Sequence, residues 1–464
     1  MRVALVTWGD PSGWSSASYS GCPGDAGNSE GYSVLSCIDA DRILLFVQDS
    51  MIVPATRLDR RNDVYRKCVE HTICCRHARD YGEWLNEVKE YVKCAVGQMA
   101  PRIADRISVL VLPSEGEPKD ERCELTSKFT GRPDLMYAVG LLQAYRGLID
   151  DTKDDGQMEL MFDMTHGVNY LTHIVARIAR DVAGVLSIGR AQVRVDYRGA
   201  VPIVMNRHYE MTSVLPAETP RISPDAYDDA GLDEWTKLTK FALRANAPLL
   251  LLKSFEGSGL EDLLEAVPDQ LSTIANVRWN GDSSVTVDYA FKRIPAVMKK
   301  PGAAYMSILR DAIRRRLVSA RGSEYSLASL NRIKDEVFSR ISEQAYIIVE
   351  AELENLNRAA ESLGDGDCRR YQDLIKYECS AHPEARGPEG QGGQEPRTEG
   401  RGGLPRDLRN FVAHAGLLKE LIYVCMHGQE IYLRYKEDDL CEFLKSQDVR
   451  CSWASSIESA QGSP

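Results

Sequence analysis

Residues 159–175, ELMFDMTHGVNYLTHIV, pass from a short apolar run through a polar turn into a helical pattern. The apolar run at 160–162 favours a buried strand, and the apolar side chains at 171, 174, 175, 178 and 182 share one face of a helix. The turn, with Thr165, His166, Gly167 and Asn169, then lies at the helix N-terminus, where unpaired N–H groups and the helix dipole attract anions. The stretch predicts an α/β domain with a ligand-binding loop; the alternative is a plain connector in which His166 only caps the helix.

The start of the chain has a similar arrangement. An apolar run at 2–7 precedes a loop dense in turn formers, with Gly9, Asp10, Ser12 and Trp14. Further strands are expected at 42–47 and 106–112, helices within 60–98 and after residue 133, and a closing hairpin of 192–196 with 201–205 around 198–199. This alternation predicts a Rossmann-like, doubly wound and mostly parallel sheet over residues 1–205.

Loops at the carboxyl ends of parallel strands meet at one edge of the sheet, so the two loops are expected to share a pocket. The alternative for the first loop is a simple turn, with Trp14 anchored in the core. The chain has neither G-x-G-x-x-G nor G-x-x-x-x-G-K-[ST], so neither a dinucleotide enzyme nor a P-loop ATPase is indicated.

The second half of the chain is expected to be mainly helical. Residues 206–225 are polar and proline-rich, which suits a linker, and 206–300 are expected to form a connecting module, with a winged helix as one alternative. A hairpin is predicted at 277–289 across Asn280-Gly281, and helices at 303–318 and 326–361. Within an α-helical domain at 301–455, the low-complexity segment 381–403 is either a mobile surface insertion or a cover over the neighbouring cleft.

Residues 409–414, RNFVAH, lie within an expected amphipathic helix that continues to residue 424. At about 100° per residue, one apolar stripe faces the core, while Arg409 and His414 flank a second stripe formed by 413, 417, 421 and 424. Histidine can move protons near neutral pH, and arginine offers a charged planar fork to phosphate. The pair suffices for metal-free RNA cleavage by the ribose 2′-hydroxyl, and the second stripe suggests a subunit interface. The alternative is a surface arginine and a helix-flanking histidine.

Composition narrows the possibilities further. A net charge of −11 argues against a generic nucleic-acid coat protein, although a small basic cleft remains compatible with it. The twelve cysteines include no C-x-x-C pair, so neither a zinc ribbon nor a disulfide framework is expected. The metal-like cluster at 71–77 would spread its ligands around a helix, so no metal site is expected there. No apolar run is long enough to span a membrane and no signal peptide is evident, which predicts a cytoplasmic, reducing location.

Taken together, three motifs resemble those of the CRISPR-associated CARF–HEPN ribonucleases of type III systems. They are the loop Gly9-Asp10-Pro11-Ser12-Gly13-Trp14, the more specific Asp163-x-Thr165-His166-Gly167-x-Asn169, and Arg409-x4-His414. The resemblance implies a CARF domain that binds a cyclic oligoadenylate, most often cyclic tetra-adenylate, across a homodimer or larger homo-oligomer. It also implies a HEPN domain that then cleaves single-stranded RNA without a catalytic cofactor.

Residue roles follow from the same resemblance. Gly9, Asp10, Ser12 and Trp14 form the first ligand loop and Thr165, His166, Gly167 and Asn169 the second. Arg409 and His414 form the catalytic pair, supported by Asn410. Two rival functions stay open: a nucleotide-sensing regulator or DNA-binding module without nuclease activity, and an enzyme that acts in the N-terminal pocket, including on its own cyclic ligand.

Overall fold

The computed structural model forms two compact units. It describes residues 1–22, 28–54, 57, 60–75, 77–149, 156–167, 169–189, 192–204, 208–256, 267–317, 324–375 and 408–451. The first unit comprises Met1–Ile222, Tyr227–Gly231 and Gly259–Ala312, and the second comprises Ser223–Ala226, Leu232–Ser258 and Ile313–Pro464. The middle stretch expected as a connecting module is therefore divided between the units, and the insertion expected at 381–403 lies outside the described residues.

An eight-stranded sheet organises the first unit, in the order β3-β2-β11-β10-β9-β1-β4-β5. Five neighbouring strands are parallel: β10 (Val193–Val204), β9 (Met158–Asp163), β1 (Arg2–Thr7), β4 (Arg42–Gln48) and β5 (Ile107–Leu112). The remaining strands are β11 (His208–Glu218), β2 (Ala17–Ser20) and β3 (Asn28–Gly31). The expectation of a mostly parallel, Rossmann-like sheet is confirmed. Val3, Ala4, Leu5 and Val6 are wholly buried because the central strand is covered on both faces.

Two expectations about β10 and its neighbour β11 are wrong. The hairpin expected around Arg198-Gly199 is absent, since β10 runs through both residues as one irregular strand. The stretch 206–225, expected as a linker, contains β11, which pairs antiparallel with β10. Pairing with β10 satisfies the backbone of a polar segment that has little apolar pattern of its own, so tertiary context overrides the local signal.

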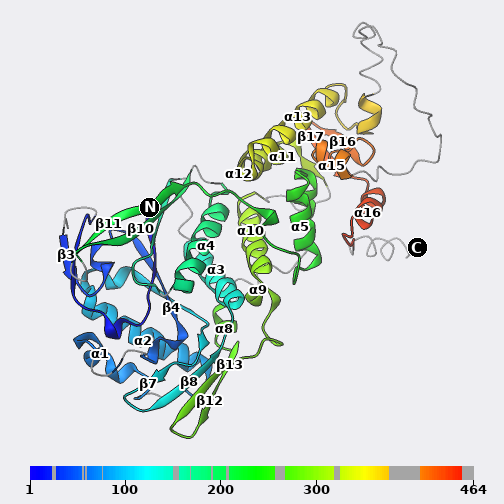
Figure 1. Ribbon diagram of the computed structural model, residues 1–464. Helices are drawn as coiled ribbons and strands as arrows, with labels where there is room; N and C mark the ends of the chain where they lie inside the picture. Colours follow the sequence, from blue (N-terminus) through cyan, green and yellow to red (C-terminus); the bar gives the residue numbers. More distant parts are fainter. Residues whose placement is uncertain are drawn as a thin grey trace, which may run out of the picture. The chain divides into compact units, whose positions relative to one another are not determined.

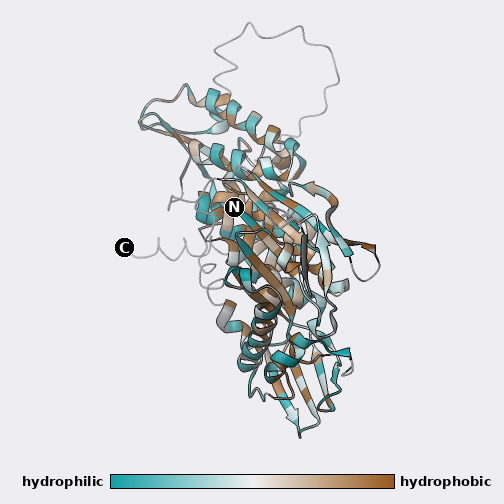
Figure 2. Ribbon diagram, turned by 90° about the vertical axis from the view of Figure 1, so that its left-hand side faces the viewer, coloured by the Kyte–Doolittle hydropathy of each residue, from teal (hydrophilic) through white to brown (hydrophobic). Residues whose placement is uncertain are grey.

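Four helices complete this α/β arrangement: α1 (Asp63–Cys68), α2 (Tyr81–Met99), α3 (Pro133–Ile149) and α4 (Asn169–Leu186). Helices α3 and α4 lie side by side, with α1 and α2 on the other side of β4 (Figure 1). Apolar residues gather on the strands and on the inner helix faces, and polar residues on the outer faces (Figure 2). Helix α4 follows β9 directly, as the sequence predicts, so its N-terminus lies at the carboxyl edge of the sheet.

A second, smaller sheet belongs to the same unit. Its strands are β12 (Ala275–Asn280), β13 (Ser284–Tyr289), β8 (Leu125–Thr130), β6 (Glu115–Gly116) and β7 (Lys119–Asp120). The hairpin predicted across Asn280-Gly281 is confirmed, with Gly281 at φ +61° in its turn. Asp49, wholly buried beyond β4, accepts hydrogen bonds from Ser114 N (3.0 Å), Tyr81 Oη (3.0 Å) and Tyr289 Oη, so it joins the two sheets. Burial raises the pKa of Asp49 to about 6.

The helices α8 (Val267–Leu271) and α9 (Ala296–Lys299) also belong to the first unit, and α10 (Pro301–Leu317) begins in the first unit and ends in the second. The second unit contains α5 (Glu234–Arg244), α6 (Pro248–Lys253), α11 (Leu327–Ile333), α12 (Ser339–Ile341), α13 (Glu343–Ala360), α15 (Leu408–Ala413) and α16 (Glu437–Lys445). The single helix expected at 326–361 is interrupted, because Ser342 is extended and its side chain caps α13 by accepting from Ala345 N.

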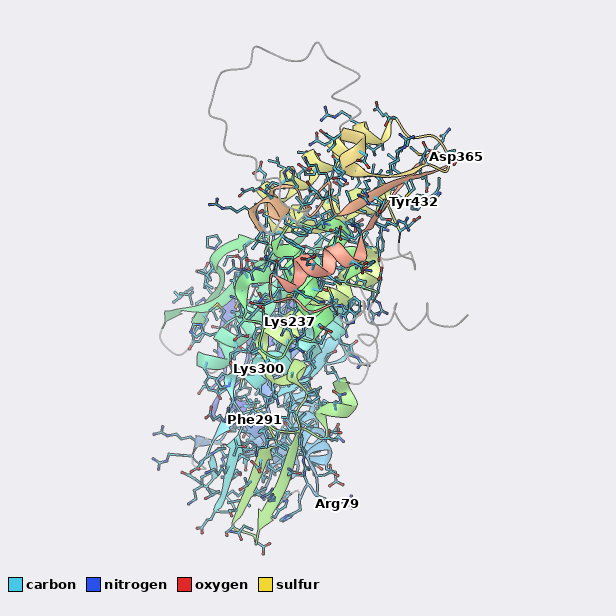
Figure 3. The ribbon with its side chains drawn as sticks, turned by 90° about the vertical axis from the view of Figure 1, so that its right-hand side faces the viewer. Arg79, Lys237, Phe291, Lys300, Asp365 and Tyr432 are labelled. Carbon is cyan, nitrogen blue, oxygen red and sulfur yellow. A yellow bond between two sulfur atoms is a disulfide. The ribbon has the colours of Figure 1, made fainter. Side chains whose placement is uncertain are left out.

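The second unit also has a sheet that was not expected. Its order is β14-β17-β16-β15, with bounds Tyr325–Ser326, Glu430–Tyr435, Ile422–His427 and Cys368–Arg370. Asp365 accepts a hydrogen bond from Gly428 N in the turn between β16 and β17 (2.7 Å), and Figure 3 labels Asp365 together with Tyr432 of β17 in this unit. This part of the chain is therefore a helical layer on a small antiparallel sheet, not a purely helical domain.

The pairing of the cysteines differs more from the sequence-based expectation than any other feature of the fold. The described residues include four disulfides: Cys22–Cys37, Cys68–Cys94, Cys74–Cys123 and Cys368–Cys425. Their partners are 15 to 57 residues apart, so sequence spacing could not show the pairing. The expectation that the cysteines form no disulfide framework is therefore wrong for these four pairs. None of the helices in the described ranges is long and apolar enough to cross a membrane.

Candidate functional site

The segment 408–416 forms a short helix that ends in a tight turn. Helix α15 stops at Ala413 because Ala415 and Gly416 take positive φ values of 49° and 68°. The Gly416 N–H then returns to Phe411 O (2.8 Å), which closes the helix end. A side chain at Gly416 would meet Ala247 Cβ at 2.5 Å, so this position requires glycine. The prediction that this helix continues to residue 424 is therefore wrong.

Burial on this segment also differs from the expected pattern. Phe411 is wholly buried and stacks on Phe443 of α16, with ring centroids 4.5 Å apart. Of the predicted interface stripe, Leu417, Leu421 and Val424 are buried in the core, because the chain has turned into β16. The stripe is therefore not an exposed subunit interface. Arg409, Asn410, Ala413 and His414 are exposed.

A cavity of about 610 Å³ opens beside His414. It is lined by Glu352, Asn355, Arg358, Tyr371, Ile375, Asn410, His414, Leu417, Leu418, Lys419 and Glu420. The structure thus brings Asn410 and His414 to one cavity, whereas Arg409 is not among its lining residues. The guanidinium of Arg358 and the ammonium of Lys419 supply positive charge there, in a chain that is acidic overall.

Glu352 is the residue at this cavity that the sequence did not reveal. Its carboxylate lies 3.1 Å from His414 Nδ1, although the two residues are 62 positions apart. The Glu352 side chain is 13% exposed and that of His414 is 51% exposed, so the acid is held in the wall while the imidazole faces the cavity. A hydrogen bond from Nδ1–H to Glu352 leaves Nε2 available to exchange a proton. The signal in the sequence that could have pointed to Glu352 is its place on the helix α13, as an acidic residue between the buried apolar residues Val349 and Leu353.

The two loops predicted to bind ligand meet at the carboxyl edge of the large sheet. Strands β1 and β9 are adjacent and parallel, and Gly9 N donates to His166 O (2.8 Å). The indole of Trp14 stacks on the His166 ring, with centroids 4.3 Å apart at 22°. The expectation that the loops converge is thus correct, and Trp14 is a half-buried ring of this site.

The first loop is held by its own side chains. The Asp10 carboxylate accepts from Ser12 N (2.9 Å) and from Ser12 Oγ (2.7 Å). Ser12 is wholly buried, so its hydroxyl supports the shape of the loop. In the second loop, Thr165 Oγ1 donates to Asp163 Oδ1 (2.6 Å) and accepts from Ala200 N (3.0 Å). Asn169 begins α4, and its side chain lies outside the described residues.

Gly167 is the most crowded position of the site. A Cβ atom there would lie 2.2 Å from Thr7 Oγ1 and 2.2 Å from Thr172 Oγ1. Both threonines are buried and β-branched, so neither can rotate away freely. The absence of a side chain at residue 167 therefore allows the loop to pack against β1 and α4.

Two protein-family models match this chain, one over the region of the two loops and one over the region of the cavity. One family model, described as the CARF domain of the CRISPR system endoribonuclease Csx1, matches residues 3–202, and a second, the HEPN domain of the same endoribonuclease, matches residues 342–437. The chain belongs to the CARF–HEPN family. A CRISPR system endoribonuclease Csx1 from Methanocaldococcus jannaschii is 25% identical over 245 residues, which are 52% of this chain and 45% of that protein. The aligned region thus spans less than half of that relative.

The family boundaries agree with the observed elements. The CARF match runs from β1 to β10 and contains both loops. The HEPN match begins at Ser342, the cap of α13, and ends at Glu437, the first residue of α16. Glu352, Asn410 and His414 all lie within the HEPN match, so the cavity and the family motif occupy the same part of the chain.

Burial controls the protonation of His166. Desolvation lowers the pKa of His166 to about 4, and the neutral ring accepts a hydrogen bond at Nε2 from Val34 N (3.1 Å). The folded pKa lies below the unfolded value of about 6.5, so the unfolded chain binds this proton first. Stability contributed by neutral His166 is present above about pH 6.5 and is lost as the pH falls toward 4.

We expect this effect to be measurable as a difference between variants. Between pH 7 and pH 5, wild type should lose about 2 kcal/mol of unfolding free energy relative to His166→Gln. Urea unfolding of both proteins at both pH values measures this difference in unfolding free energy. Burial raises the pKa values of Asp49 and Asp163 to about 6, so these two groups change stability with pH in the opposite direction. Because both proteins contain the two aspartates, their contribution cancels in the comparison. A difference that does not change with pH would contradict a neutral buried His166.

Glu352→Gln should slow any reaction in which His414 transfers a proton by about 10-fold, because a hydrogen bond to a charged group is worth about 1.5 kcal/mol. The amide keeps the volume but can turn its NH₂ toward the imidazole and disturb the orientation of the ring. Glu324→Gln is the matched control, since Glu324 lies 3.1 Å from Nε2 of the exposed His427. Single-turnover cleavage rates compare the two variants. Equal rates for Glu352→Gln and wild type would remove Glu352 from the site.

Proposed function

We propose that this protein is an endoribonuclease of type III CRISPR defence that cleaves single-stranded RNA when a cyclic oligoadenylate binds its CARF domain. The observation that carries the proposal is His414 in an open cavity, with its Nδ1 on Glu352 and cationic side chains nearby. RNA supplies its own nucleophile, so the protein needs only to position the 2′-hydroxyl, move protons and offset charge on the phosphate.

Each residue has a chemical task in this proposal. His414 Nε2 exchanges the proton of the attacking or leaving oxygen, Glu352 orients the ring, and Asn410 supports the substrate at the cavity. Arg409 stabilises the charge of the phosphorane through its guanidinium. Because Arg409 is exposed and outside the cavity lining, the proposal places the complete site at a twofold seam between two copies of the chain.

The sensor loops suit an anionic, base-rich ligand. The N-terminus of α4, which has 18 residues, offers backbone N–H groups to phosphate, and Trp14 with His166 presents stacked rings to adenine. A small cyclic oligoadenylate has both phosphates and bases, with cyclic tetra-adenylate as the preferred ring. We propose Gly9, Asp10, Ser12, Trp14, Thr165, His166, Gly167 and Asn169 as the loops that receive it.

An RNA-cleavage assay on the purified protein tests the proposal. Labelled single-stranded RNA is incubated with a panel of linear and cyclic oligoadenylates, with brief exposure to excess EDTA in parallel. We expect cleavage only with a cyclic ligand, unchanged by EDTA, and products that end in a 2′,3′-cyclic phosphate and a 5′-hydroxyl. Binding of the ligand without any cleavage would instead favour the regulator, and a metal requirement would refute the proposed chemistry.

A further inference from the structure

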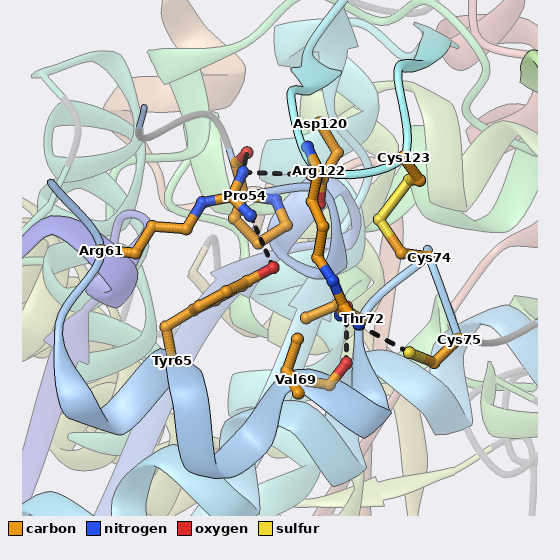
Figure 4. The surroundings of a disulfide bond; sticks show 10 residues. All are labelled: Pro54, Arg61, Tyr65, Val69, Thr72, Cys74, Cys75, Asp120, Arg122 and Cys123. Atoms are coloured by element: carbon orange, nitrogen blue, oxygen red, sulfur yellow. Dashed lines mark hydrogen bonds and ion pairs between the residues drawn. A yellow bond between two sulfur atoms is a disulfide. The ribbon is translucent and has the colours of Figure 1, made fainter. Parts of the chain in front are cut away.

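Cys74, Asp120 and Cys123 come together where two turns of the first unit meet (Figure 4). Cys74 lies in the turn after the 3-10 helix Val69–His71, Asp120 ends β7, and Cys123 lies in the turn between β7 and β8. Their sulfur atoms and one carboxylate oxygen are within 4.8 Å of one another, the sole grouping of this kind in the described part of the chain.

This grouping differs from the cluster visible in the sequence at 71–77. The ring of His77 lies against Trp279, with centroids 4.2 Å apart, and Cys75 Sγ accepts from Arg122 Nη1 at 3.6 Å. Only Cys74 of the sequence cluster points to the new grouping. Its partners come from a turn nearly fifty residues away, so the helical-wheel argument against a metal does not apply to them.

The Asp120 carboxylate has an unused acceptor directed into buried space. Its Oδ1 accepts from Arg61 Nη2 (3.1 Å) and from Arg122 N (2.8 Å), and its side chain is 0% exposed. Its Oδ2 is buried and has no hydrogen-bond partner among the described residues. A buried carboxylate oxygen without a donor is costly, and a bound cation would satisfy it.

The charges around Cys74 and Cys123 are compatible both with a disulfide and with two thiolates that bind a divalent cation. A disulfide is neutral, and two thiolates with one divalent cation also sum to zero. The pairing of Asp120 with Arg61 is therefore compatible with both. The two other disulfides of the first unit belong to no such grouping with a carboxylate, so the surroundings distinguish Cys74–Cys123 from them.

The backbone geometry also fits a metal. The Cα atoms of Cys74 and Cys123 are 5.6 Å apart. Two thiolates on a tetrahedral zinc lie about 3.8 Å apart, given Zn–S bonds of about 2.3 Å. Small side-chain rotations of the reduced cysteines reach that separation. Asp120 and Cys123 have the x2 spacing on a tight turn that is common for paired zinc ligands.

We propose that Cys74, Asp120 and Cys123 bind one zinc-type divalent cation when the Cys74–Cys123 disulfide is reduced, with water as the fourth ligand. A phosphine reductant and one water convert the disulfide into two thiols and phosphine oxide. The cation then displaces both thiol protons to solvent and bonds to the two sulfurs and the carboxylate. The site is structural and independent of the proposed nuclease, so failure of either leaves the other intact.

Cobalt titration of the full-length protein tests this site. The protein is reduced with TCEP, transferred to oxygen-free buffer and titrated with Co²⁺, then with Zn²⁺. We expect one equivalent of Co²⁺ with a thiolate-to-cobalt charge-transfer band, which Zn²⁺ abolishes because it binds such sites more tightly. Reduced wild-type protein that gives no charge-transfer band would overturn the proposal.

Three variants locate the site. Cys123→Ser and Asp120→Asn should each weaken Co²⁺ binding about 100-fold or more, since each loses a ligand. Cys22→Ser, from a disulfide that joins no grouping of this kind among the described residues, should bind as wild type does. Circular dichroism checks folding, and if Asp120→Asn fails to fold because Arg61 loses its partner, Cys123→Ser still decides the matter. An unchanged band in Cys123→Ser refutes the assignment.

Discussion

His414→Ala should reduce ligand-activated RNA cleavage by about 10³-fold or more, because the variant loses the imidazole that is proposed to transfer protons at the cavity. Affinity for the cyclic oligoadenylate should stay within about 2-fold of wild type, since the proposed sensor loops belong to the other compact unit. Cleavage rates at saturating ligand, with ligand binding measured by calorimetry, give both quantities.

His427→Ala is a closely matched control. His427 and His414 are 52% and 51% exposed, and each lies 3.1 Å from a carboxylate oxygen. Loss of His427 should leave cleavage almost unchanged, because it lies at the end of β16 and does not line the cavity. If the two variants cleave equally well, the assignment of the active site to His414 is wrong.

Gly167→Ala should weaken activation by the cyclic ligand about 100-fold. The added Cβ would lie 2.2 Å from two threonine oxygens, so the loop must move away from β1 and α4. Overpacking of this kind costs about 3 kcal/mol, which corresponds to about 100-fold in affinity if ligand binding requires the native loop. The concentration of ligand that gives half-maximal cleavage measures the effect.

Gly97→Ala makes the same chemical change where space is available. Gly97 lies in α2 with no atom within 4 Å of an added Cβ, so alanine should stabilise the helix by about 0.5–1 kcal/mol without changing activation. An unshifted activation curve for a folded Gly167→Ala protein would show that the 165–169 loop does not receive the activator.

Much of the first unit could be predicted because its central strands are buried on both faces. β1, β4, β5 and β9 are continuous apolar runs, and α4 repeats its apolar residues at helical spacing. The polar turns that follow β1 and β9 could then be placed at one sheet edge. The strand β11 lacked such a signal: it is polar and exposed along much of its length, and its pairing with β10 and β2 makes it a strand.

The second unit was less predictable for the same reason. A helical wheel from residue 408 to 424 gives two apolar stripes, but Ala415 and Gly416 turn the chain, and the apolar residues from 415 to 424 that make up most of both stripes become core. The strands β16 and β17 are short, and their sheet includes β14 and β15, which are two and three residues long. The local pattern of apolar residues indicates that a residue is buried, but it does not indicate which helix or strand packs against that residue.

The amino-acid sequence alone determined the alternation of strands and helices, the two sensor loops and the Arg409-x4-His414 motif, since each depends on neighbours within a few residues. Only the tertiary structure decided which distant groups meet: Glu352 with His414, Trp14 with His166, and Cys74 with Asp120 and Cys123. These contacts join segments that are 46 to 152 positions apart in the sequence. Their formation depends on packing of the whole unit, which no local pattern encodes.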